Sequence, residues 1–140
     1  MSYDISLKDP ATNETLCATF NHEMAGGTYA IGGTNELWLN ITYNYARWYY
    51  HAGVFAATKE ESEGIRTIYG KSGAESIPIL RSAIAALQAL EEDISEQDRL
   101  ACISVGADGY WMPTKENAIR PLYQLLSMAQ LRPDGIWDGD

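Results

Sequence analysis

A short basic loop followed by the start of a helix is the part of this sequence best suited to binding an anion. The loop contains Arg66, Tyr69, Lys71 and Ser72, with Gly70 among them. The first backbone N–H groups of a helix have no partner inside it, and the helix dipole places a partial positive charge there. We therefore expect Arg66, Lys71 and Ser72 to contact phosphate. The alternative is that these basic residues are spread over a helix surface.

Residues 70–72, GKS, do not belong to a P-loop. That motif is G-x-x-x-x-G-K-[ST] between a strand and a helix. Here the preceding glycine, Gly64, is one residue too distant, and residues 61–64 are charged ESEG instead of an apolar strand. What remains is a local concentration of positive charge, because Arg66, Lys71 and Arg81 are three of only ten basic residues.

An aromatic stretch lies earlier in the chain. Six rings fall within thirteen positions: Trp38, Tyr43, Tyr45, Trp48, Tyr49 and Tyr50. Exposed Tyr and Trp rings stack on bases or bind protein partners. We expect Tyr43, Tyr45, Trp48 or Tyr69 to stack on a base, with Arg47 supporting the phosphate contacts. A core can absorb three or four such rings, and core packing is the favoured interpretation for most of them.

Patterns for catalysis and metal binding are weak. His22 and His51 have neither metal-ligand spacing nor a neighbouring nucleophile motif, although the fold could bring them together for acid–base chemistry. Asp134, Asp138 and Asp140 could hold a divalent cation, but an acidic tail beside glycine is typically solvated. The sequence thus favours a non-catalytic protein without cofactor or metal, with an enzyme as the alternative.

The composition is that of one globular domain of 140 residues. Its net charge of −9 repels nucleic acids and anionic membranes, so we expect neither as a partner. No apolar stretch is long enough to span a membrane, and the first residues do not have the pattern of a signal peptide. Cys17 and Cys102 lie far apart in apolar settings. They predict two buried free thiols in the reducing cytoplasm.

The elements that position these residues predict an α+β fold. We expect a short antiparallel sheet, made of an N-terminal hairpin plus a third strand, packed against two or three helices. Residues 3–7 and 15–20 predict the hairpin, with the turn DPATNE between them. Residues 36–45 alternate with a period of two, which predicts a strand that runs into a helix near Asn44. A continuous helix from Glu36 is the alternative.

The most clearly marked helix follows the basic loop. Ser72 and Glu75 have the spacing of a capping box and place its start there. Ser76 is the alternative cap, with Pro78 just inside the helix. The apolar face of this helix predicts a core position and comprises Leu80, Ile84, Leu87 and Leu90.

The remaining third of the chain predicts an acidic loop, a buried segment and a last helix. Residues 91–98 form the loop, and residues 100–105, LACISV, predict a strand or a buried helical turn. Thr114 or Asn117 caps the last helix. Pro121 favours a start or a kink near Asn117.

Three segments resemble small uncharacterised proteins of phage and prophage genomes: NITYNY (40–45), IYGKSGAESIP (68–78) and LRPDGIWDGD (131–140). Those proteins have no settled function, so the resemblance assigns a role to no residue. It implies a setting only. Small acidic phage proteins often act against host defence, by binding a defence protein or by sequestering a nucleotide signal.

The leading hypothesis is therefore a binding protein that sequesters a small phosphorylated ligand such as a nucleotide signal. A second hypothesis is an acidic inhibitor that docks on a basic surface of a host defence protein. It would use exposed aromatic rings and the acidic segments 59–63 and 91–98. A third is a prophage structural or assembly component whose aromatic residues form a homo-oligomer interface.

Overall fold

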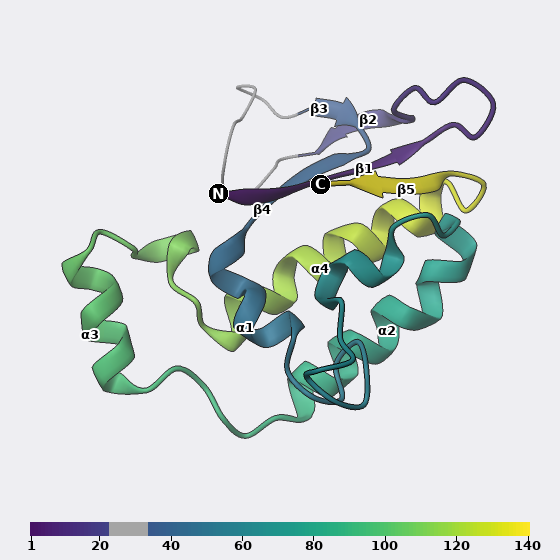
Figure 1. Cartoon of the computed structure of the whole chain (residues 1–140). Coiled ribbons are helices and arrows are strands. Elements are labelled where there is room, and N and C mark those ends of the chain that lie inside the picture. The colour runs from purple at the N-terminus through teal and green to yellow at the C-terminus, as the bar shows by residue number, and fades with distance from the viewer. Residues whose placement is uncertain (23–33) are drawn as a thin grey trace.

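The computed structural model describes residues 1–22 and 34–140 of the chain (Figure 1). In chain order its strands and α-helices are β1 (Ser2–Lys8), β2 (Cys17–His22), β3 (Thr34–Glu36), β4 (Trp38–Thr42), α1 (Ala46–Tyr49), α2 (Gly73–Ala89), α3 (Glu96–Ser104), α4 (Lys115–Leu131) and β5 (Ile136–Gly139). Three 3-10 turns accompany them: η1 (Tyr43–Tyr45), η2 (Gly64–Ile68) and η3 (Gly109–Trp111). The fold is α+β, with a short sheet packed against helices, as the sequence predicts.

Strand β1 is the centre of a three-stranded antiparallel sheet, with β4 on one side and β5 on the other. Its alternate residues Tyr3, Ile5 and Leu7 are buried, whereas Asp4 is exposed. Successive side chains of a strand point to opposite faces. The buried face is the one that α2 and α4 cover, and β5 adds the buried ring of Trp137 to it (Figure 1).

The predicted hairpin forms only at its turn. The amide of Asp9 donates to the carbonyl of Glu14 at 2.8 Å, and the amide of Leu16 donates to Leu7 at 2.9 Å. Beyond that point Leu37 lies between the two strands, because its amide donates to Leu16 and its carbonyl accepts from Leu7. Strand β2 therefore pairs with β3 in a separate two-stranded sheet, while β1 takes β4 and β5 as partners.

The burial of β2 explains this division. Its residues Cys17, Thr19 and Phe20 are exposed, so it has little apolar surface to contribute to the helix-covered face. Cys17 is a free and exposed thiol, and Cys102 is free and partly buried. The prediction of two buried thiols is therefore wrong, since neither cysteine lies in the core.

A strand runs directly into a helix at the aromatic stretch. Strand β4 ends at Thr42, whose side chain accepts a hydrogen bond from the amide of Asn44 and so starts η1. Helix α1 follows at once. The strand-then-helix interpretation is confirmed, and a continuous helix from Glu36 is wrong.

Helices α2 and α4 form the layer beneath the sheet (Figure 1). The capping box is present: Ser72 Oγ accepts from the amide of Glu75, and the Glu75 carboxylate accepts from the amide of Ser72. Ser72, not Ser76, is thus the cap. Thr114 caps α4, and Pro121 lies within that helix instead of delaying its start. Within the described part of the chain, no helix has both the length and the apolar character needed to cross a membrane.

Candidate functional site

The N-terminus of α2, where a phosphate was expected, is closed by the protein itself. Its first amides donate to protein oxygens: Gly73 to the carbonyl of Gly135 (2.8 Å), Ala74 to that of Pro133 (3.0 Å) and Glu75 to the hydroxyl of Ser72 (3.0 Å). A Cβ atom added at Gly73 would lie 2.7 Å from the carbonyl oxygen of Arg132. The turn that follows α4 thus occupies the place of the expected anion.

The basic loop is bound to β5 in the same way. The amide of Gly70 donates to the carbonyl of Trp137, and the amide of Trp137 donates to the carbonyl of Lys71, each at 2.9 Å. The Ser72 hydroxyl is used by the capping box. The loop backbone and Ser72 are therefore committed to holding the C-terminal strand, and Lys71 keeps only its partly buried side chain for other contacts.

The structure brings Arg66, Tyr43 and Tyr69 together at the end of the sheet. Arg66 donates from Nε to the carbonyl oxygen of Asp140 at 2.8 Å and from Nη2 to the Tyr43 hydroxyl at 3.3 Å. Its guanidinium lies 4.9 Å from the centre of the Tyr3 ring. Burial, with a smaller effect of the Asp140 charge and of neighbouring groups, raises the pKa of Tyr69 above its ordinary value. These contacts fasten the chain end to β1 and η2.

The other three predicted site residues lie elsewhere. Tyr45 and Trp48 are buried in the core, where the Tyr45 hydroxyl donates to the carbonyl of Tyr110 and Trp48 Nε1 donates to that of Pro113. Burial raises the pKa of Tyr45 well above its ordinary value. Neither ring presents a face to solvent for a base to stack on, so the core interpretation holds for both. Arg47 lies over the Trp48 ring and pairs with a carboxylate of α3.

Histidines and aspartates do not form a reactive cluster in the described part of the chain. His51 pairs with Glu92 at 3.5 Å, and the side chain of His22 lies outside the described residues. Asp134 pairs with Arg132 and Asp138 with Lys8, each at 2.8 Å. Among the described residues, no group of three or more His, Cys, Asp or Glu side chains is placed to hold a metal ion.

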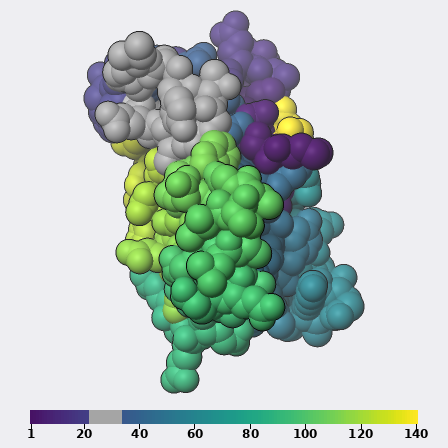
Figure 2. Space-filling model, turned by 90° about the vertical axis from the view of Figure 1, so that its left-hand side faces the viewer, coloured from purple at the N-terminus to yellow at the C-terminus, as the bar shows by residue number. Residues whose placement is uncertain are grey.

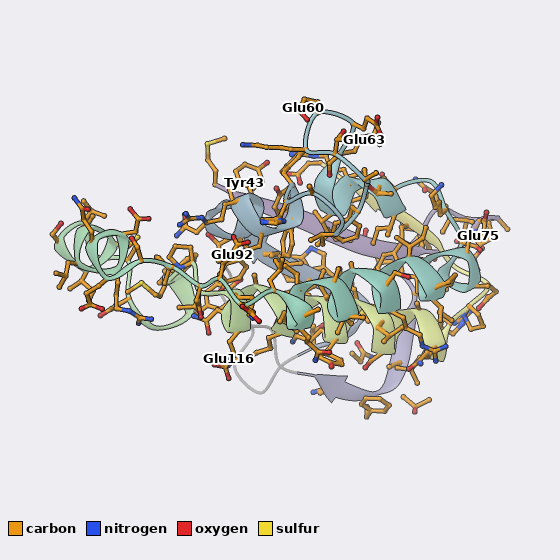
Figure 3. All side chains as sticks on the ribbon, turned by 90° about the horizontal axis from the view of Figure 1, so that it is seen from below. Tyr43, Glu60, Glu63, Glu75, Glu92 and Glu116 are labelled. Atoms are coloured by element: carbon orange, nitrogen blue, oxygen red, sulfur yellow. The ribbon has the colours of Figure 1, made fainter. Side chains whose placement is uncertain are left out.

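Helix α3 is the element that departs most from the expected packing. It stands at the edge of the molecule, away from the layer of α2 and α4 (Figures 1 and 3). Ser95 caps it by accepting from the amide of Asp98. None of the nine residues of α3, all of which the structure describes, is buried. The prediction that residues 100–105 form a strand or a buried turn is therefore wrong.

The apolar side of α3 is largely exposed. Leu100 is 58% exposed, Ile103 50% and Val105, just beyond the helix, 81%. We call these three residues the α3 surface. The partly buried residues of the helix are Arg99 and Cys102. A surface helix normally turns its apolar stripe toward the core. Here half or more of the surface of each apolar side chain is left uncovered, so water contacts side chains that a core would usually hold.

The two ends of this segment hold α3 in place. At the first end Ile94 is buried, and the Asp93 carboxylate accepts from the amides of Ile94 (2.7 Å) and Lys115 (3.0 Å). At the second end Asn44 Nδ2 donates to the carbonyl of Trp111 at 2.9 Å. We call residues 91–111 the α3 arm. The arm is therefore held at both ends, and the ion pair between Arg47 and Asp98 adds a contact from the helix itself.

Comparison of the chain with protein-family models, with curated proteins and with solved structures found no match. The resemblance to phage proteins therefore stays a prediction.

Negative charge is concentrated around the α3 arm. Residues 91–116 contain seven acidic residues and two basic ones, a net charge of −5 out of −9 for the chain. The view from below shows Glu92 and Glu116 on the side of the helical layer nearest α3 (Figure 3). The view from the α3 side shows the arm, in green, forming the centre of the facing surface (Figure 2). The arm thus combines exposed apolar side chains with carboxylates.

Proposed function

We propose that this protein is a non-catalytic interaction module that binds a basic surface of another protein through the α3 arm. The observation that carries the proposal is the exposure of the α3 surface. Contiguous exposed apolar side chains with polar neighbours are characteristic of protein-binding sites. The surrounding carboxylates favour a partner of opposite charge, since complementary charges speed encounter and exclude wrong partners.

Charge also argues against two other occupants. A second copy docked on the same surface by two-fold symmetry would bring two arms of net charge −5 together. An anionic membrane would be repelled by the same carboxylates. A cationic protein surface relieves both problems, because it neutralises the arm while covering its apolar side chains.

A phosphorylated small ligand remains the second candidate function. Arg66, Tyr43 and Tyr69 lie together, which such a site would need, and Lys71 is nearby in the chain. However, the amides of Gly73 and Ala74 at the start of α2 donate to the turn after α4. These amides were the main expected phosphate donors, and neither is free. For this reason we rank it below the interaction module.

If the chain is encoded by a phage, as the resemblance implies, the partner would be a host defence protein and the module an inhibitor of it. The α3 arm would then cover a functional basic surface on that protein. The physical requirements on the partner, a cationic surface that covers the exposed apolar side chains, are the same in that setting.

The test compares three forms of the full chain. The first is wild type, the second carries Leu100→Ser with Ile103→Ser, and the third carries Leu131→Ser. Leu131 is 46% exposed and lies at the end of α4 far from α3, so it is a matched control (Figure 1). Each form is used to capture proteins from a lysate of the cells in which the protein is made, and any captured protein is then purified and titrated against all three forms at low and moderate salt.

The proposal predicts a protein that binds wild type and Leu131→Ser alike and the double variant at least about tenfold more weakly, the equivalent of about 1.4 kcal/mol. Its affinity should also fall as salt rises. Capture that is unaffected by the double variant would contradict the proposal. A thermal-shift screen with nucleotides tests the second candidate, because a ligand of the folded state raises the melting temperature. A shift lost in Lys71→Ala would favour that candidate instead.

A further inference from the structure

We infer that the docking element of the partner is a cationic amphipathic α-helix that lies antiparallel to α3; this inference rests on the function proposed above. The proposed function specifies only that the partner surface is basic. The inference adds that this surface is an α-helix and gives its direction relative to α3. Three features of the arm carry it: the shape of the exposed helix face, the state of its backbone and the position of its charges.

The exposed face of α3 alternates large and small side chains. Leu100 and Ile103 project from it, and the exposed residues Ala101 and Ser104 lie beside them. Residues three or four apart form ridges on a helix, and small residues between ridges leave grooves into which the ridges of a second helix fit. Nine residues give a helix about 14 Å long, which is enough to seat two or three turns of a partner.

The backbone of α3 favours a helix over an extended strand as the partner. A strand that adds to a protein bonds to unpaired N–H and C=O groups at the edge of a sheet. Helix α3 uses its backbone groups internally, and its N-terminus is capped by Ser95. Recognition here therefore depends on side chains, as it does when an amphipathic helix packs on another helix.

The charges of the arm set the orientation. Glu91, Glu92 and Glu96 are exposed and precede the α3 surface, so the acidic end of the arm is the N-terminal end of α3. Glu92 lies 3.5 Å from His51, yet its side chain is 65% exposed and able to accept from a Lys or Arg of a partner. Lys and Arg are most favourable in the last turn of a helix, where they complement its dipole. An antiparallel partner places its last turn at this acidic end.

The experiment uses three labelled peptides of about 18 residues, long enough to form helix on binding. All have the same composition of Leu, Ala, Gln and Lys. In the first, leucines follow helical spacing and lysines fill the last turn; in the second, the lysines are moved to the first turn; in the third, the order is shuffled so that no apolar face exists. Binding to the full chain is measured by fluorescence anisotropy, and helix formation by the far-UV circular dichroism of the mixture.

We expect the first peptide to bind about tenfold more tightly than the shuffled one, with a gain of helix on mixing, and more tightly than the second. The preference should disappear in the Leu100→Ser, Ile103→Ser double variant and persist in Leu131→Ser. Equal binding of the first and shuffled peptides, no binding of either, or a preference that survives the double variant would overturn the inference. Equal binding of the first and second peptides would overturn the antiparallel orientation.

The two proposals fail separately. If a captured protein needs the α3 surface but the peptides show no preference, the interaction module is supported and the helical partner is refuted. If the double variant captures the protein as well as wild type does, the interaction module itself is refuted.

Discussion

Replacing Leu100 by alanine should cost the folded protein little stability, although the same substitution at Leu125 should cost a great deal. Leu100 is 58% exposed on α3, whereas Leu125 on α4 is fully buried. The pair therefore tests whether the apolar side of α3 faces water, which is the observation behind both proposals.

The magnitudes follow from the burial of the two side chains. Complete burial of a leucine is worth about 1.5–3 kcal/mol, so Leu100, with less than half of its surface buried, contributes about 1 kcal/mol. The higher helix propensity of alanine offsets a few tenths of a kcal/mol of that loss. Leu125→Ala removes a fully buried side chain and leaves a cavity, which costs about 2–5 kcal/mol.

Urea unfolding, followed by circular dichroism at 222 nm (the far-UV helix signal), gives the free energy of unfolding of each variant, provided the slopes against denaturant agree. We expect a loss below about 1 kcal/mol for Leu100→Ala and above about 2 kcal/mol for Leu125→Ala. Equal losses would mean that Leu100 is buried in the folded protein. That result would refute the exposure of the apolar side of α3 and remove the basis for a docking surface.

Three further predictions concern the closure of the C-terminal strand on the body. Gly73→Ala should lower stability by about 1–3 kcal/mol, although alanine normally stabilises a helix, because its Cβ would meet the backbone of the turn after α4 at 2.7 Å. Ser76→Ala should cost about 1–3 kcal/mol, because it leaves the buried Nε1–H of Trp137 without the acceptor that now lies at 2.7 Å. The hydrogen bond from Lys8 lowers the pKa of Asp138, so Lys8→Met should raise that pKa toward its ordinary value.

Each of these predictions has a direct measurement. Denaturant unfolding checks the first two, with Ser82→Ala on the exposed side of α2 as the control for Ser76→Ala. Stabilisation by Gly73→Ala would contradict the tight approach of the turn. A carboxyl titration by NMR checks the third. Because the folded pKa of Asp138 lies below the unfolded one, its stabilising effect is present above about pH 4 and is lost as the pH falls through the folded pKa. An unchanged pKa in Lys8→Met would contradict the assigned cause.

Local signals in the sequence predicted local structure well. The Ser72–Glu75 capping box, the cap at Thr114 and the start of η1 after β4 each depend on neighbours within a few residues. Caps and periodicity act over one or two turns of chain. For that reason they are visible without knowledge of the rest of the fold.

The predicted anion site depends on residues that are distant in the sequence. The residues around Ser72 have the composition and spacing of a helix start with free amides, and that helix start forms as expected. Whether the amides stay free depends on Pro133 and Gly135, more than fifty residues later in the chain. Nothing in the loop itself indicates that this turn will bind there.

By itself the sequence determined the α+β class, the helix starts and the apolar faces of α2 and α4, because propensity, capping and periodicity are properties of short segments. Tertiary structure alone decided three things: which strand pairs with β1, that Tyr45 and Trp48 are core residues, and that the apolar side of α3 is left exposed. These outcomes depend on contacts between distant segments. The run LACISV is equally apolar in a core or in an exposed helix, and contacts of the α3 arm with distant residues, such as that of Trp111 with Asn44, decide where it lies.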